Sequence, residues 1–142
     1  MSQMAEFAAE LTAEWHAISA LTERVTAFLA ESGVDARTAH HVALVLDELL
    51  TNVATHNETV AAAVSVSLTV SGDRVSAEVV DEGAMFDPRA VPSPDLTVGV
   101  QDRRIGGLGL LLVHRLTEGL AYEREGNRNR TTFSICRAAA VR

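Results

Sequence analysis

Two apolar stripes with the spacing of amphipathic helices dominate the first half of the chain. A weak alternation of apolar and polar residues precedes them and predicts a short strand around Phe7, Ala9 and Leu11. The first stripe consists of Trp15, Ile18, Leu21, Val25, Phe28 and Leu29. The second consists of Val42, Val45, Leu46, Leu49, Leu50 and Val53. Gly33 is suited to end the first helix and Asp35 to cap the second, so we expect a strand followed by two helices packed in succession.

Strict alternation in the middle of the chain predicts a β-hairpin with one polar face. Its first strand alternates serine and threonine with Val64, Val66, Leu68 and Val70, and its second strand, after Gly72-Asp73, carries Val75, Ala77 and Val79 on one side. A third helix is predicted from Leu108, Leu111, Leu112 and Leu116. Two short strands, 120–122 and 131–135, follow it around Gly126-Asn127. The pattern indicates an α/β fold in which helices cover one face of a single sheet.

The segment between the hairpin and the third helix has a different composition. It contains all three prolines, at positions 88, 92 and 94. We expect 86–104 to be a long irregular loop. Loops of that length inside ordered domains usually serve function, so this segment is a candidate ligand lid.

Length and composition narrow the class of protein. A chain of 142 residues, of which 47% are hydrophobic and 22% charged, fits one globular domain spanning residues 1–142. A formal net charge of −7 disfavours direct binding to nucleic acid. The longest apolar run, 108–113, is too short to cross a bilayer, and no basic-then-apolar leader opens the sequence. Cys136 is the only cysteine, so we expect a reducing, cytoplasmic location without an internal disulfide.

Glu48 and Asn52 are the first candidates for chemistry. They lie four residues apart in the second predicted helix and therefore project from the same side of it, along the edge of the apolar stripe. A carboxylate and a carboxamide in this arrangement could orient a nucleophile and ligate a hard cation, with magnesium the natural choice beside phosphates. The alternative is a solvated helix flank without function.

Asp81-Glu82-Gly83 directly follows the second hairpin strand. An acidic side chain at a strand end could accept a hydrogen bond from an exocyclic amine, and Gly83 would let a flat ring approach the backbone. The alternative here is an ordinary strand-terminating turn.

Glycines 106, 107 and 109 open the third predicted helix, and free backbone N–H groups at a helix start can bind anions. Arg103 and Arg104 could reach phosphate oxygens from the preceding loop. Neither a P-loop nor a Rossmann fingerprint is present. An ordinary loop-to-helix junction with solvated arginines is the alternative.

In order along the chain, these three segments resemble the boxes of the GHKL ATPase superfamily, whose nucleotide-binding domain has the Bergerat fold. The similarity covers nearly the whole chain and is closest to the anti-sigma-factor serine kinases. It is carried by Leu46-Asp-Glu-Leu-Leu-Thr-Asn52, Asp81-Glu-Gly-Ala-Met-Phe-Asp-Pro88 and Arg104-Ile-Gly-Gly-Leu-Gly109. The resemblance implies a two-layer α/β sandwich with a mixed, mainly antiparallel sheet and ATP between the second helix and the lid.

The resemblance also implies roles for single residues. Glu48 matches the residue that polarises the attacking hydroxyl, Asn52 the magnesium ligand, Asp81 the acceptor for the adenine amine, and Gly83 the glycine under the purine. The lid positions that close over the phosphates are Arg104, Gly106, Gly107, Leu108 and Gly109. Thr131 and Thr132 lie in the late strand where the family keeps a hydroxyl near the adenine, and we assign that position to Thr132. For His56, at a position often basic in the family, we expect packing at the helix end.

One departure from the family concerns Met85, which stands where many relatives have a second glycine, so the rim of the pocket is expected to differ. The resemblance implies an anti-sigma factor with serine/threonine kinase activity. It would use Mg-ATP to phosphorylate an anti-anti-sigma antagonist, sequester a sigma factor and form a homodimer. The alternative is a binding module of the same fold that senses ATP or sequesters a partner without phosphotransfer. Intact Glu48 and Asn52 favour the kinase.

Overall fold

The computed structural model describes residues 4–56, 62–89 and 105–137, with 105–108 described by their backbone alone. In these ranges the chain forms five strands and three helices. They are β1 (Ala5–Thr12), α1 (Trp15–Glu31), α2 (Ala36–His56), β2 (Ala63–Ser71), β3 (Arg74–Asp81), α3 (Ile105–Leu116), β4 (Glu118–Glu125) and β5 (Arg128–Cys136). No helix within the described residues is long and apolar enough to cross a membrane.

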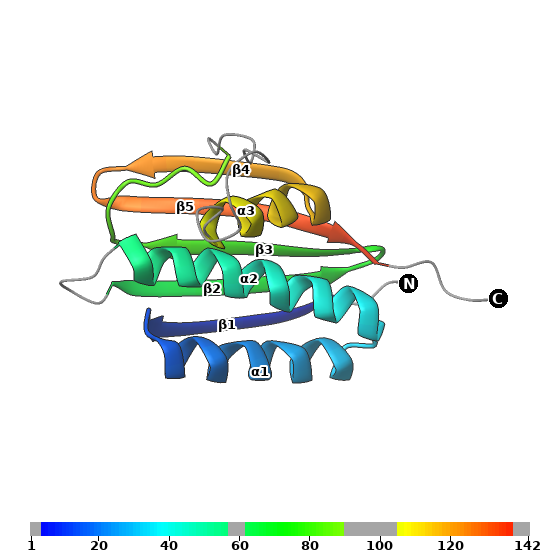
Figure 1. Cartoon of the computed structure of the whole chain (residues 1–142). Coiled ribbons are helices and arrows are strands. Elements are labelled where there is room, and N and C mark those ends of the chain that lie inside the picture. Colours follow the sequence, from blue (N-terminus) through cyan, green and yellow to red (C-terminus); the bar gives the residue numbers. More distant parts are fainter. Residues whose placement is uncertain (1–3, 57–61, 90–104, 138–142) are drawn as a thin grey trace.

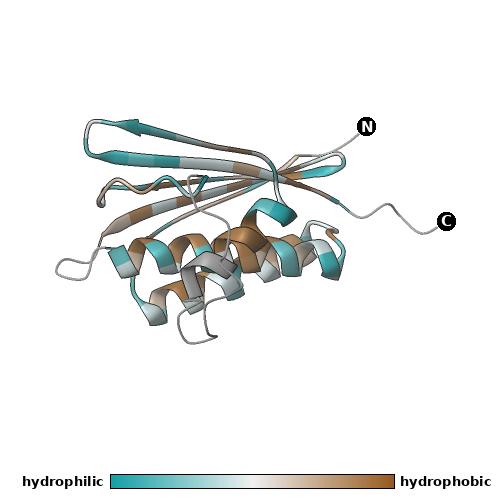
Figure 2. Ribbon diagram, turned by 45° about the horizontal axis from the view of Figure 1, so that its top comes forward, coloured by the Kyte–Doolittle hydropathy of each residue, from teal (hydrophilic) through white to brown (hydrophobic). Residues whose placement is uncertain are grey.

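The strands form one sheet in the order β1-β2-β3-β5-β4, and each of the four pairings is antiparallel. The helices lie on one side of this sheet, with α1 near β1 and α2 across the middle strands (Figure 1). A view from another angle separates the helical layer from the sheet (Figure 2). The predicted two-layer α/β fold is confirmed, with the described sheet antiparallel throughout rather than mixed.

The core lies between the two layers and follows the predicted hydrophobic pattern. In β2, Val64, Val66, Leu68 and Val70 are buried, while the intervening serines face the uncovered side of the sheet. Val42, Leu46 and Leu50 in the centre of α2 are fully buried and belong to the same hydrophobic core. This packing fixes α2 over the sheet and so determines where the residues on its edge point.

The ends of the first two helices are defined by local interactions that the sequence predicts. Gly33 has a φ of 79°, a left-handed conformation that glycine adopts without strain, and α1 ends two residues before it. Asp35 caps α2, because its Oδ2 accepts hydrogen bonds from both the backbone N–H and the hydroxyl of Thr38, each at 2.9 Å. With its start fixed, α2 carries Glu48 and Asn52 in its last three turns.

The last hairpin is longer than the predicted short strands at 120–122 and 131–135. It extends β4 to Glu125 and begins β5 at Arg128, on either side of a turn where Gly126 has a φ of 59°. The sequence at this end of the hairpin shows no alternation of apolar and polar residues, because it is rich in charged residues. Glu123 and Arg130, for example, lie opposite each other and face the uncovered side of the sheet. The extension matters for function because it brings Asn129 and Arg124 beside the end of β3.

Candidate functional site

Glu48, Asn52 and His56 form a ladder along the last turns of α2, as their spacing predicts. The Asn52 amide nitrogen donates to the Glu48 backbone oxygen at 2.9 Å and to Glu48 Oε2 at 3.0 Å. His56 Nδ1 donates to the Asn52 backbone oxygen at 2.8 Å, and the imidazole lies 4.3 Å from the Phe86 ring between centroids. His56 is exposed at the end of the helix, where its ring contacts Phe86, and the Asn52 side chain is fixed with its nitrogen toward Glu48.

The Glu48 carboxylate lies where α3 crosses α2. Removal from water raises the pKa of Glu48 above its ordinary value; the hydrogen bond from Asn52 opposes this rise, and repulsion by Asp47 adds to it. A Cβ placed on Gly109 would fall well inside van der Waals contact with this carboxylate. The backbone of α3 therefore approaches Glu48 so closely that only glycine leaves the carboxylate undisturbed at position 109.

Asp81 is buried at the end of β3, and its two carboxylate oxygens have different surroundings. Oδ1 accepts hydrogen bonds from the Gly83 backbone N–H and from the Asn129 amide, each at 2.9 Å. Among the described residues, nothing donates a hydrogen bond to Oδ2. The predicted turn and the predicted acceptor are therefore compatible, because one oxygen makes the turn while the other is left for a ligand.

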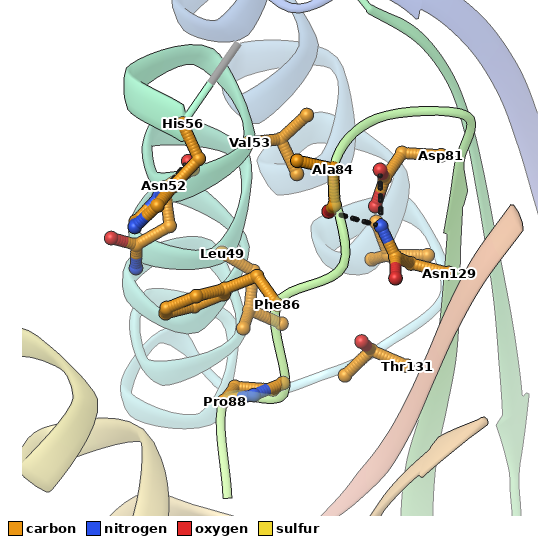
Figure 3. A pocket seen from close by; sticks show the side chains of 11 residues that line it. Leu49, Asn52, Val53, His56, Asp81, Ala84, Phe86, Pro88, Asn129 and Thr131 are labelled. Carbon is orange, nitrogen blue, oxygen red and sulfur yellow. Dashed lines mark hydrogen bonds between the residues drawn. The ribbon is translucent and has the colours of Figure 1, made fainter. Parts of the chain in front are cut away.

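A pocket lies between the last turns of α2 and the ends of β3 and β5. Its lining consists of Leu49, Asn52, Val53, His56, Val79, Asp81, Ala84, Phe86, Pro88, Asn129 and Thr131 (Figure 3). Apolar side chains form most of this wall, with a few polar groups from the two opposite sides. Small-molecule sites have this composition, in which apolar walls bind a flat group and a few polar atoms select it.

The structure corrects one predicted site residue. Thr132, assigned to the hydroxyl near the adenine, is on the uncovered face of the sheet, beside Ser76 and Ser134. Side chains along a strand alternate between faces, so Thr131 is the one that lines the pocket. The sequence alone does not distinguish the two adjacent threonines, because nothing in it indicates which of them faces the covered side of the sheet.

The glycine box lies at the start of a helix, as predicted, since α3 begins at Ile105 and includes Gly106, Gly107, Leu108 and Gly109. Gly109 contacts the site through Glu48. Arg103, Arg104 and most of the proline loop lie outside the described residues. The phosphate-binding role of this segment stays a prediction.

Three polar residues of the last hairpin belong to the site although the sequence analysis did not select them. Asn129 is only 3% exposed and donates to Asp81, while Tyr122 and Arg124 on β4 both donate to its amide oxygen. They lie in and beside a run of charged residues typical of a solvated turn. Only the strand register, counted outward from Gly126-Asn127, indicates that Asn129 and Arg124 face inward.

The described residues contain no group of three or more His, Cys, Asp or Glu side chains placed to hold a metal ion. Asn52 nevertheless fits a hard cation, since its amide nitrogen is committed to Glu48 and no described residue donates to its Oδ1. An amide oxygen is a donor type that magnesium accepts in proteins.

Comparison with known proteins agrees with this geometry. The model of the histidine kinase-like ATPase domain matches residues 11–135. The serine/threonine-protein kinase BtrW of Bordetella bronchiseptica is 33% identical over 101 residues, which cover 70% of this chain and 71% of BtrW. The crystal structure of the RsbU and RsbW domains of Rv1364c from Mycobacterium tuberculosis has the same fold, with a TM-score of 0.70 at 17% identity; the match covers 97% of this chain and 34% of that one. The family resemblance of the three boxes is thereby confirmed, and this chain belongs to the histidine kinase-like ATPase domain family.

Proposed function

We propose that this chain is an anti-sigma factor that binds Mg-ATP in the pocket between α2 and the sheet and phosphorylates a serine of an antagonist protein. The observation that carries the proposal is Asp81, a buried carboxylate with one oxygen bonded and one left toward an apolar pocket. Asp81 Oδ2 accepts a hydrogen bond from the exocyclic amine of adenine. Val79 and Leu49 contribute apolar wall for the ring, and Thr131 adds a hydroxyl beside it.

The phosphates extend from this pocket toward the start of α3, where backbone N–H groups favour anions. Asn52 Oδ1 would hold magnesium, which neutralises phosphate charge when bound. Glu48 accepts the proton of the acceptor serine while the serine oxygen forms a bond to the γ-phosphorus of ATP. The bond from that phosphorus to the bridging oxygen breaks, and ADP leaves with the electron pair. A raised pKa suits this role, because it makes the carboxylate a stronger base.

The name of one relative supports the class of reaction. BtrW is a serine/threonine-protein kinase by name, and the structural neighbour includes an RsbW domain. We infer an anti-anti-sigma domain as the phosphate acceptor, a sigma factor as the sequestered protein, and a homodimer as the working form. The Glu48–Asn52 pair favours this kinase over a module that only senses ATP, because ATP sensing needs no base at Glu48.

Asp81→Asn should lower ATP affinity about tenfold or more. The new amide places a donor where the adenine amine needs an acceptor, and an unmade buried hydrogen bond costs about 1–3 kcal/mol. Calorimetric titration with Mg-ATP measures the loss. Glu82→Gln is the matched control, because it removes the neighbouring charge from an exposed side chain. Wild-type affinity in Asp81→Asn would exclude this pocket as the adenine site.

Gly109→Ala should reduce phosphate transfer by more than it reduces ATP affinity. The added methyl group displaces the Glu48 carboxylate, whereas alanine in a helix is favoured over glycine by about 1 kcal/mol. The melting temperature should therefore stay the same or rise while the transfer rate falls. Leu112→Ala, on the exposed side of the same helix, is the control. Unchanged transfer in Gly109→Ala would show that contact with α3 does not set the position of Glu48.

Glu48→Gln should abolish transfer while leaving ATP binding intact, because general bases contribute about 10²–10⁴-fold to rates. The assay follows label from ATP to the serine of the antagonist encoded nearest this gene. The wild-type rate should fall as the pH drops through the raised pKa of Glu48, and that fall should be absent from any residual activity of the variant.

Asp47→Asn is the matched control, since Asp47 is exposed on the same helix. The Asp47→Asn variant should still transfer phosphate. Loss of the repulsive charge lowers the pKa of Glu48, so the acid limb of the rate profile should move to lower pH. Full transfer by Glu48→Gln would remove Glu48 from the mechanism. Absence of transfer from wild type to any candidate antagonist would favour the ATP-sensing module.

A further inference from the structure

A row of polar side chains crosses three strands beside the pocket. Asp81 on β3 lies opposite Asn129 on β5, and Asn129 lies opposite Arg124 on β4. Asp81 and Asn129 are 6% and 3% exposed, respectively. The next inward position of β5 is Thr131, followed by the apolar Phe133 and Ile135, so the polar row is confined to the end of the sheet that borders the pocket.

The side-chain amide of Asn129 has its orientation fixed from the β4 side. Its Oδ1 accepts from the Tyr122 hydroxyl and from Arg124 Nη1, the latter at 3.1 Å. Two donors on one oxygen prevent the amide from rotating by half a turn, because its NH₂ group would then meet donors on β4. The amide nitrogen must therefore point toward β3.

The amide nitrogen of Asn129 connects the carboxylate of Asp81 to the turn that follows it. It donates to Asp81 Oδ1 at 2.9 Å and to the Ala84 backbone oxygen at 2.8 Å (Figure 3). Arg124 adds a third attachment by donating to the Gly83 backbone oxygen at 2.8 Å. These contacts hold the Asp81 carboxylate so that Oδ1 accepts hydrogen bonds from the protein and Oδ2 accepts none from the described residues. They also hold the turn beside the pocket.

We propose that Asn129, oriented by Tyr122 and Arg124, is a positioning residue that makes the pocket select purines with an exocyclic amine over purines with a carbonyl at the same place. The selection rests on the proposed nucleotide binding. A carboxylate can only accept hydrogen bonds, and engaging Oδ1 holds Oδ2 at one position toward the ligand, so a 6-amino group is bound and a 6-oxo group is repelled. Without Asn129, Asp81 Oδ1 keeps only the hydrogen bond from the Gly83 N–H and the turn loses an attachment, so the position of Oδ2 is less strictly fixed and the discrimination weakens.

The test is a double-mutant cycle between positions 81 and 129, measured by calorimetric titration with ATP and with inosine triphosphate, which carries the 6-oxo group. Asn129→Ala should lower ATP affinity about tenfold and leave the weak binding of inosine triphosphate nearly unchanged. In an Asp81→Ala background, Asn129→Ala should cause no further loss. Asn127→Ala, an exposed asparagine in the turn of the same hairpin, should match wild type throughout.

Two results would overturn the proposal. One is an equal loss of ATP affinity in both backgrounds, which would mean that Asn129 acts without Asp81. The other is an unchanged preference for ATP over inosine triphosphate in Asn129→Ala. If Asn129→Ala fails to fold, Tyr122→Phe serves instead, because it removes one of the two donors that orient the amide and should give a smaller loss of the same preference.

Failure of the proposed function is distinguishable from failure of this inference. If wild type binds neither nucleotide, the proposed function is wrong, and amide exchange at Gly83 still tests the positioning. The Gly83 N–H donates to Asp81 Oδ1, so it should exchange faster in Asn129→Ala than in wild type or Asn127→Ala. Equal exchange rates in the three proteins would show that Asn129 does not hold the turn.

Discussion

The buried carboxylate of Asp81 constrains the whole pocket end of the sheet. A charge removed from water needs hydrogen bonds in compensation, and here these come from the Gly83 backbone and from Asn129. The first donor requires the chain to turn sharply as β3 ends. The second requires β5 to be in register beside it, which in turn requires the long β4–β5 hairpin. The segment beside the pocket is thus fixed by the need to satisfy one side chain.

The opposite wall of the pocket depends on a second arrangement of the same kind. On α2 the Asn52 amide donates a hydrogen bond to the Glu48 carboxylate, and α3 approaches that carboxylate closely at Gly109. The hydrophobic packing of α2 on the sheet sets the distance between the two walls. A ligand that contacts Asp81 at one end and the Glu48–Asn52 pair at the other would therefore be held by two rigid layers, which suits a reaction that depends on alignment.

The fold was largely predictable because the strands and helices have clear periods. The alternation in β2 and β3 and the stripe of α2 are strong enough to identify the core, and the boxes around Glu48, Asp81 and Gly109 have recognisable spacing. The last hairpin was harder, because its charged ends contain no apolar alternation. For the same reason the sequence does not show that Thr131, and not Thr132, faces the pocket, or that Asn129 lines it. Polar residues that satisfy one another across strands become visible only when the register is known.

The measurement that tests the central claim most directly is a titration of the isotopically labelled wild-type chain with Mg-ATP, followed by backbone amide chemical shifts. Nucleotide binding in this pocket predicts the largest changes at Gly83, Ala84 and Thr131, with changes along the last turns of α2 that require magnesium. Shifts centred instead on the basic hollow around Arg37, His41 and Arg115, or no shifts at millimolar nucleotide, would contradict it.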